Sequence, residues 1–140
     1  MRYLLLLLLS ITLSSNAQKY WGNIGLSNVE IFDKLGKPES AIHDWQRDGG
    51  IDLMYYLSDG TTYRCELNLD NICIGEVFYD KATNIHTWID YMNNRFSKID
   101  IRGIGKMGWY DDKNSVNYWV TLDDHMTLAV VEAYKVKPNQ

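Results

Sequence analysis

The middle of the chain alternates hydrophobic and polar residues with the period of a β-strand. Residues 61–69 send two sets of side chains to opposite sides, namely Tyr63, Cys65, Leu67 and Leu69 against Thr62, Arg64, Glu66 and Asn68. Residues 51–57 are apolar at both parities, as is typical of a central strand, and residues 72–79 form a further apolar segment. A shorter strand is expected around residues 41–45. These segments predict an antiparallel meander in which the odd-numbered positions of residues 63–69 face the core.

The turn between the first two long strands sets which side chains lie across from one another. Asp59-Gly60 is suited to a two-residue type I′ turn. Such a turn would place Tyr55 on the same face as Arg64 and Glu66, away from the face of Tyr63. One face is then apolar and should carry the helices, whereas the other mixes aromatic and charged groups.

A short helix is expected just before this meander, at residues 28–35. Ser27 occupies the N-cap position and Glu30 follows three residues later, as in a capping box. Gly36 is suited to the end of the helix, and Pro38 prevents it from continuing. The expected buried stripe consists of Val29, Phe32 and Leu35, with Ile31 beside them.

The second half of the chain repeats this order of elements. Residues 83–96 have apolar positions at helical spacing, with Asp80 or Thr83 as the expected cap. These positions are Ile85, Trp88, Ile89, Met92 and Phe96. A hairpin with arms at residues 116–122 and 126–134 follows, and its alternation places Trp119 on the side away from the core.

The two halves also match at a few positions. Placing residues 69–70 (Leu-Asp) on residues 122–123 (Leu-Asp) brings Val77 onto Val130. An internal duplication, with units at residues 25–80 and 81–136, is therefore one interpretation of the chain. The predicted fold class is α+β, with helices packed on one face of a mainly antiparallel sheet, either as one unit or as two helix-plus-meander units in tandem.

Residues 1–17 have the layout of a secretory signal peptide. Arg2 gives a positive start, residues 4–13 are largely apolar, and Ser15-Asn16-Ala17 provides the small residues of a cleavage site. Cleavage after Ala17 would leave one secreted or periplasmic domain at residues 18–140. No membrane anchor is expected, because the apolar run is shorter than the ~20 residues of a spanning helix and no cysteine at the junction could accept a lipid.

Charge and composition favour a protein partner over a nucleic acid. The net charge of -4 disfavours binding to phosphates, whereas the 10 Tyr and 5 Trp are residue types enriched at protein-binding hot spots. No set of residues has the spacing of a catalytic site. Asp123-Asp124-His125 is interpreted as a solvated turn, because adjacent side chains in a turn rarely converge on one metal ion. We therefore predict no enzyme activity, no cofactor and no metal.

The two cysteines, Cys65 and Cys73, could form a disulfide in an exported protein or remain two buried thiols, depending on the register of their strands. A two-residue turn at Asp70-Asn71 would put them on opposite sides of the sheet. A three-residue loop at residues 68–70 would put them directly opposite each other. Both alternatives remain open from the sequence.

A helix-to-strand pattern extends over residues 25–79. It contains Gly25-Leu26-Ser27-x-Val29, Leu35-Gly36-Lys37-Pro38 and Met54-Tyr55-Tyr56-Leu57. The pattern resembles that of the β-lactamase-inhibitor-protein-like group, which includes the SmpA/BamE outer-membrane assembly lipoproteins. The resemblance implies a binding module that uses a sheet surface and performs no catalysis. The chain departs from the group in lacking a lipid-accepting cysteine, and its second half is not a close copy of its first.

Three classes of function follow from these observations. The first is an exported protein-binding module, of inhibitor or immunity type, that presents Tyr55, Arg64, Glu66 and Trp119 on an aromatic-rich sheet face. The second is an accessory protein of envelope or outer-membrane assembly. The third is a small hydrolase or ligand carrier. The expected partner is another protein, and the oligomeric state is left open.

Overall fold

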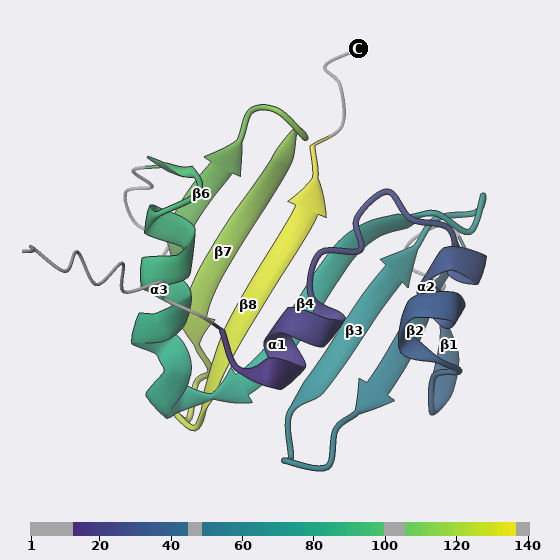
Figure 1. Cartoon of the computed structure of the whole chain (residues 1–140), viewed down its shortest axis with the longest axis horizontal. Coiled ribbons are helices and arrows are strands. Elements are labelled where there is room, and N and C mark those ends of the chain that lie inside the picture. Colours follow the sequence, from purple (N-terminus) through teal and green to yellow (C-terminus); the bar gives the residue numbers. More distant parts are fainter. Residues whose placement is uncertain (1–12, 45–48, 100–105, 137–140) are drawn as a thin grey trace, which may run out of the picture.

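The computed structural model of the chain describes residues 13–44, 49–99 and 106–136 (Figure 1). Its framework is one eight-stranded antiparallel sheet with the order β1-β2-β3-β4-β8-β7-β6-β5. The strands are β1 (Ser40–Asp44), β2 (Gly50–Tyr56), β3 (Thr62–Leu67), β4 (Cys73–Lys81), β5 (Ser97–Ile99), β6 (Met107–Asp111), β7 (Val116–Leu122) and β8 (Leu128–Lys135). The helices are α1 (Ser15–Tyr20), α2 (Asn28–Leu35), α3 (Ile85–Asn93) and the 3₁₀ turn η2 (Ala82–Asn84).

The predicted α+β class with an antiparallel sheet is confirmed in outline. Helix α2 precedes the meander β1–β4, helix α3 precedes the meander β5–β8, and the two meanders join through the β4–β8 pair. In that pair Phe78 lies opposite Val131, which is the residue on which the shift between the two halves places it. The sheet dominates more than expected, because α1, α2 and α3 have only 6, 8 and 9 residues. The duplication itself stays a prediction.

All three α-helices pack on the same face of the sheet, which we call the helix face. Buried residues of the helices, such as Ala17, Ile31 and Trp88, belong to one hydrophobic cluster with Tyr63 and Cys65 of β3. Figure 1 shows α1, α2 and α3 in front of the strands in the same view. The opposite face, which we call the open face, has no helix over it in the described ranges 13–44, 49–99 and 106–136.

The parity predicted for residues 63–69 is confirmed for residues 63–67 and wrong for Leu69, which is 69% exposed because β3 ends at Leu67 and residue 69 belongs to the following loop. Tyr63 and Cys65 have no exposed surface and Leu67 is 1% exposed, so the odd positions face the core. The register predicted between β2 and β3 is wrong, because Tyr55 pairs with Tyr63 rather than lying on the other face. Tyr55 is therefore a core residue with 2% of its surface exposed.

The loop between β2 and β3 explains this difference. It has three residues, 58–60, since Leu57 and Thr61 make the closing backbone hydrogen bond from the Leu57 N–H to the Thr61 carbonyl (2.9 Å). Gly60 takes a φ of 84°, as in hairpins that end a turn with a left-handed residue. The Asp59 carboxylate accepts hydrogen bonds from the Thr61 N–H (3.0 Å) and hydroxyl (2.6 Å), which favours the longer loop. One extra loop residue moves every β2 side chain to the other face.

Helix α2 has the predicted capping box. The Ser27 hydroxyl accepts from the Glu30 N–H (3.3 Å), and the Glu30 carboxylate accepts from the Ser27 N–H (2.7 Å). The predicted buried stripe is wrong in part: Ile31 and Leu35 are buried, whereas Val29 and Phe32 are exposed. A single i, i+4 pair is enough to contact the sheet, because α2 lies beside its edge rather than across its centre (Figure 1).

Helix α3 is shorter than the predicted range of residues 83–96 and buries Trp88 and Met92. Neither predicted cap is used, since no side chain caps α3 and the helix follows directly from the turn η2. The Asp80 carboxylate instead accepts from the Trp88 indole N–H (2.9 Å) and the Asn84 amide (3.0 Å). Asp80 thus fixes the start of α3 to the end of β4 by side-chain contacts.

Residues 13–17, which the sequence analysis assigned to a signal peptide, take part in the fold. Ser14 caps α1, while Leu13 and Ala17 are buried in the core. Residues 1–12 lie outside the described residues, and cleavage after Ala17 stays a prediction. Tyr20, which follows the predicted cleavage position, contacts Tyr55 and Tyr63 (ring centroids 5.6 and 5.7 Å apart), so the end of α1 packs on β2 and β3.

Candidate functional site

The open face carries a row of side chains that the strand pairings align across the sheet. Arg64 of β3 pairs with Val77 of β4, which pairs with Glu132 of β8, which pairs with Trp119 of β7. Gly108 of β6 extends the row beyond Trp119. Three of the predicted binding residues therefore belong to this face: Arg64 and Trp119 in this row, and Glu66 in the next.

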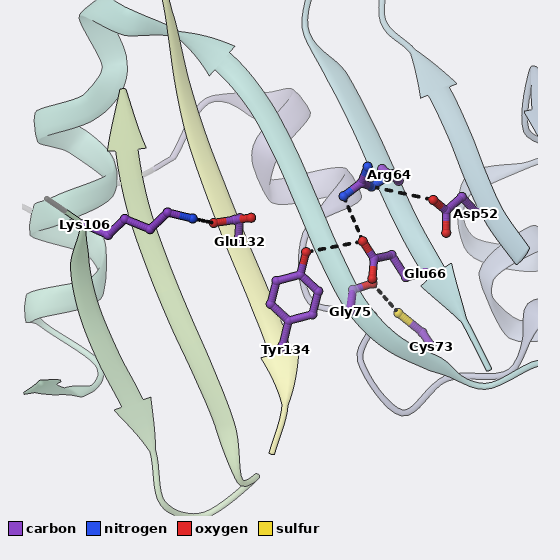
Figure 2. Close-up of polar contacts among 8 residues, drawn as sticks. All are labelled: Asp52, Arg64, Glu66, Cys73, Gly75, Lys106, Glu132 and Tyr134. Carbon is purple, nitrogen blue, oxygen red and sulfur yellow. Dashed lines mark hydrogen bonds and ion pairs between the residues drawn. The ribbon is translucent and has the colours of Figure 1, made fainter. Parts of the chain in front are cut away.

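Arg64 is held in place by two acidic residues (Figure 2). Its terminal nitrogen donates to Glu66 Oε1 (2.8 Å), and its Nε lies 4.0 Å from Asp52 Oδ2. The Tyr134 hydroxyl donates to the same Glu66 oxygen (3.3 Å). Glu66 is only 6% exposed, so it positions Arg64 rather than offering its own carboxylate to a partner. The guanidinium Nε is buried and makes no hydrogen bond.

A second ion pair lies farther along the row. Lys106 Nζ contacts Glu132 Oε2 at 2.7 Å, joining the residue just before β6 to β8 (Figure 2). The Lys106 side chain is 38% exposed and that of Glu132 18%. Because the pair is half-buried, screening by solvent limits its contribution to stability to about 1 kcal/mol or less.

Two large aromatic rings lie flat against glycines on neighbouring strands. A Cβ atom at Gly108 would be 2.5 Å from Trp119 Cζ3, and one at Gly75 would be 2.7 Å from Tyr134 Cδ1. The glycines therefore make room for the rings to pack on the backbone, a known way of covering a glycine in a sheet. Burial raises the pKa of Tyr134 above its ordinary value, so its hydroxyl stays protonated as a donor to Glu66.

The fourth predicted binding residue, Tyr55, does not belong to this site. Its hydroxyl donates to the Gly36 carbonyl (3.0 Å) at the end of α2, and burial raises its pKa to about 12. Its neighbour Tyr56, which is 55% exposed, pairs with Thr62 on the open face instead. Sequence reasoning also missed Tyr134; its alternation with Val131 and Ala133 along β8 was the available signal.

A polar cluster on the helix face is structural. Glu76 is 1% exposed, and its Oε1 accepts from the Gly22 N–H (3.0 Å), the Asn23 N–H (2.8 Å) and the Tyr63 hydroxyl (2.7 Å). Lys34 reaches the Asn23 amide oxygen at 2.6 Å. Burial raises the pKa of Glu76. The carboxylate therefore ties the segment after α1 to β4 and is closed to solvent.

The two cysteines lie together on the helix face as thiols, with their sulfurs 2.9 Å apart. Neither register considered for them holds. The loop comprises residues 69–71, closed by the Asn68 N–H and the Ile72 carbonyl (3.0 Å), with Asn71 at a φ of 58°. The pairing then shifts by one residue, since Leu67 pairs with Cys73 and Glu66 with Gly75, leaving Ile74 as the extra residue of a bulge.

The segment Asp123-Asp124-His125 forms the turn between β7 and β8. Asp123 Oδ1 accepts from the N–H groups of Leu128 (2.7 Å) and Thr127 (2.6 Å), and these hydrogen bonds lower the pKa of Asp123. In the part of the chain that the structure describes, no group of three His, Cys, Asp or Glu side chains is placed to hold a metal ion. Within the same part, no helix combines the length and hydropathy needed to cross a membrane.

No family model matches the sequence, and no curated protein matches it. Two solved structures have a similar arrangement of elements. One is a DUF4309 family protein (YjgB) from Bacillus subtilis, with a TM-score of 0.47 and 9% identity over 79% of this chain and 78% of that one. The other is an extracellular protein containing a SCP domain from Bacillus anthracis, with a TM-score of 0.48 and 11% identity over 81% of this chain and 44% of that one. At these scores neither likeness indicates a function.

Proposed function

We propose that this chain is an exported module that binds another protein through the open face of its sheet. The observation that supports the proposal most directly is the one-sided packing of the eight-stranded sheet, with all three α-helices of the described residues on the helix face. The export part of the proposal rests on the sequence of residues 1–17.

The size of the open face fits a protein partner. With strands ~4.8 Å apart and about 3.3 Å per residue, eight strands of roughly six residues cover on the order of 700 Å². A standard interface buries about 800 Å² on each partner. The face is therefore close in size to one side of a standard interface.

The chemistry of the face points the same way. Trp119, Tyr56 and Arg64 are of the residue types that dominate protein-binding hot spots. Trp119 and Arg64 are held before binding, by Gly108 and by the acidic residues beside Arg64, which reduces the entropy lost on association. A nucleic acid is a poor alternative, since Glu132 and the other acidic residues of the face repel phosphates.

The test compares a charge-adding variant on the open face with one outside that face. Asn117→Arg, on the open face beside Trp119, should abolish cross-linking to a partner protein, whereas Thr83→Arg, exposed in η2, should leave it intact. A photo-reactive residue in place of Tyr56 forms the cross-link, and mass spectrometry identifies the contacted protein. Loss of cross-linking in Thr83→Arg but not in Asn117→Arg would refute the proposal.

A truncation on the same face gives a second readout. Trp119→Ala should weaken the affinity for the cross-linked partner by about tenfold or more, as expected for a hot-spot residue. Its own unfolding free energy should fall by only about 1–2 kcal/mol, because the ring is half-buried. Unchanged affinity, measured by calorimetry with purified partner, would remove Trp119 from the site.

A further inference from the structure

Cys65 and Cys73 are placed on neighbouring strands with their side chains on the same face. The loop of residues 69–71 pairs Cys73 with Leu67, so Cys73 lies diagonally across from Cys65 rather than opposite it. The sulfurs are 2.9 Å apart, which is closer than two non-bonded sulfurs normally approach. The Cys65 thiol donates to the Cys73 sulfur, and the Cys73 thiol donates to the Gly75 carbonyl (3.3 Å).

We propose that Cys65 and Cys73 are joined by a disulfide bond. The bond forms as the β3–β4 hairpin folds in an oxidising compartment and is buried in the core of the folded chain. The bond would join two strands that are already paired, eight positions apart in the chain. The disulfide would covalently link β3 to β4, the two strands that carry Arg64 and Glu66 on the open face and Glu76 on the helix face.

The oxidation requires an external disulfide, either of a protein oxidase or of oxidised glutathione. One cysteine thiolate attacks a sulfur of that disulfide, releases one thiolate and leaves a mixed disulfide. The second cysteine thiolate then attacks the mixed disulfide, forms the Cys65–Cys73 bond and releases the other thiolate. The two cysteine sulfurs lose two electrons in total, the oxidant gains them, and the two cysteine protons end on its thiols.

Burial decides when this can happen. In the folded chain Cys65 has no exposed surface and Cys73 is 1% exposed, so an oxidant cannot reach either sulfur. The hydrogen bond with Cys65 and burial both raise the pKa of Cys73, which removes its nucleophilic thiolate. Oxidation is therefore expected during folding, before the helices cover the sheet, and the finished bond is expected to resist reduction in the native state.

The test starts from the unfolded, reduced full chain. It is refolded by dilution into buffer with excess oxidised glutathione, then denatured and treated with iodoacetamide. Intact mass should show a monomer with no label, and two labels only when reductant is added before labelling. A refolded monomer that carries two labels without reductant, two glutathione adducts, or a disulfide-linked dimer would overturn the proposal.

Two controls keep the result interpretable. Cys65→Ser and Cys73→Ser should each lack the internal bridge and have one remaining sulfur, labelled or bearing one glutathione, whether or not the variant folds, because the label is added after denaturation. The melting temperature of the oxidised wild-type chain should exceed that of the reduced chain by about 10 °C. A lower melting temperature of the oxidised chain would show that the bridge distorts the native core and would also overturn the proposal.

Discussion

Glu76 offers a sharp test of how the segment after α1 is held. In Glu76→Ala the N–H groups of Gly22 and Asn23 and the hydroxyl of Tyr63 lose their shared acceptor. Each buried donor left without a partner costs about 1–3 kcal/mol. The Gly22 N–H can donate to water instead, because its hydrogen bond to Glu76 is only partly buried. The Asn23 N–H and the Tyr63 hydroxyl therefore account for most of the lost stability. Removing the buried carboxylate charge offsets part of the cost of the lost hydrogen bonds. We expect the unfolding free energy of Glu76→Ala to be about 3 kcal/mol lower than that of the wild-type chain.

The matched control is Glu76→Gln, which keeps an oxygen in the place of the acceptor and removes the charge. Burial raises the pKa of Glu76 in the folded state above its ordinary value of 4.5. The stability that this group contributes is therefore fully present below pH 4.5 and is lost as the pH rises through the raised value. The unfolding free energy of the wild-type chain should thus fall, relative to Glu76→Gln, as the pH increases from about 4.5.

Urea unfolding followed by circular dichroism measures both effects. The wild-type chain, Glu76→Ala and Glu76→Gln are compared at pH 5, 6.5 and 8, with m-values checked for equality. Two results would refute the reasoning. One is a loss below about 1 kcal/mol in Glu76→Ala, which would mean that water satisfies the three donors. The other is a difference between wild type and Glu76→Gln that does not change with pH.

Three further substitutions, at two positions, test the faces of the sheet. Gly108→Ala should displace the Trp119 ring, because the new Cβ would lie 2.5 Å from it. The substitution should lower the unfolding free energy by about 1–3 kcal/mol and shift the tryptophan fluorescence. An unchanged fluorescence spectrum would contradict the packing of Trp119 on Gly108. Tyr55→Phe should cost about 1 kcal/mol through the lost bond to the Gly36 carbonyl, and Tyr55→Ala about 3–5 kcal/mol, both measured by urea unfolding. A loss of unfolding free energy below about 0.5 kcal/mol in Tyr55→Ala, as is typical of a surface residue, would contradict the observed register.

Several features of the fold could be predicted because they depend on near neighbours in the sequence. The alternation along β3 identified Tyr63, Cys65 and Leu67 as core residues, and they are buried. The hairpin of β7 and β8 and the capping box of α2 were predicted for the same reason. Strand period, caps and turn residues act over two to four positions, so the amino-acid order alone carries this information.

The candidate site could be predicted only in part. Arg64, Glu66 and Trp119 lie on the open face as expected, whereas Tyr55 is in the core. A hairpin loop one residue longer than expected exchanged Tyr55 for Tyr56 on this face. Loops of two and three residues differ little in free energy. A change of one loop residue nevertheless moves every side chain of β2 to the other face, so the local sequence could not decide the register.

The amino-acid order by itself determined which segments become strands and helices and which side of each strand is apolar. Only the tertiary structure decided how those segments meet. The β4–β8 pair that joins the two meanders and the contact of Glu76 with Asn23, 53 positions away, leave no local pattern in the chain. Such contacts form between segments that are distant in sequence, and their stability comes from packing and burial that no short stretch contains.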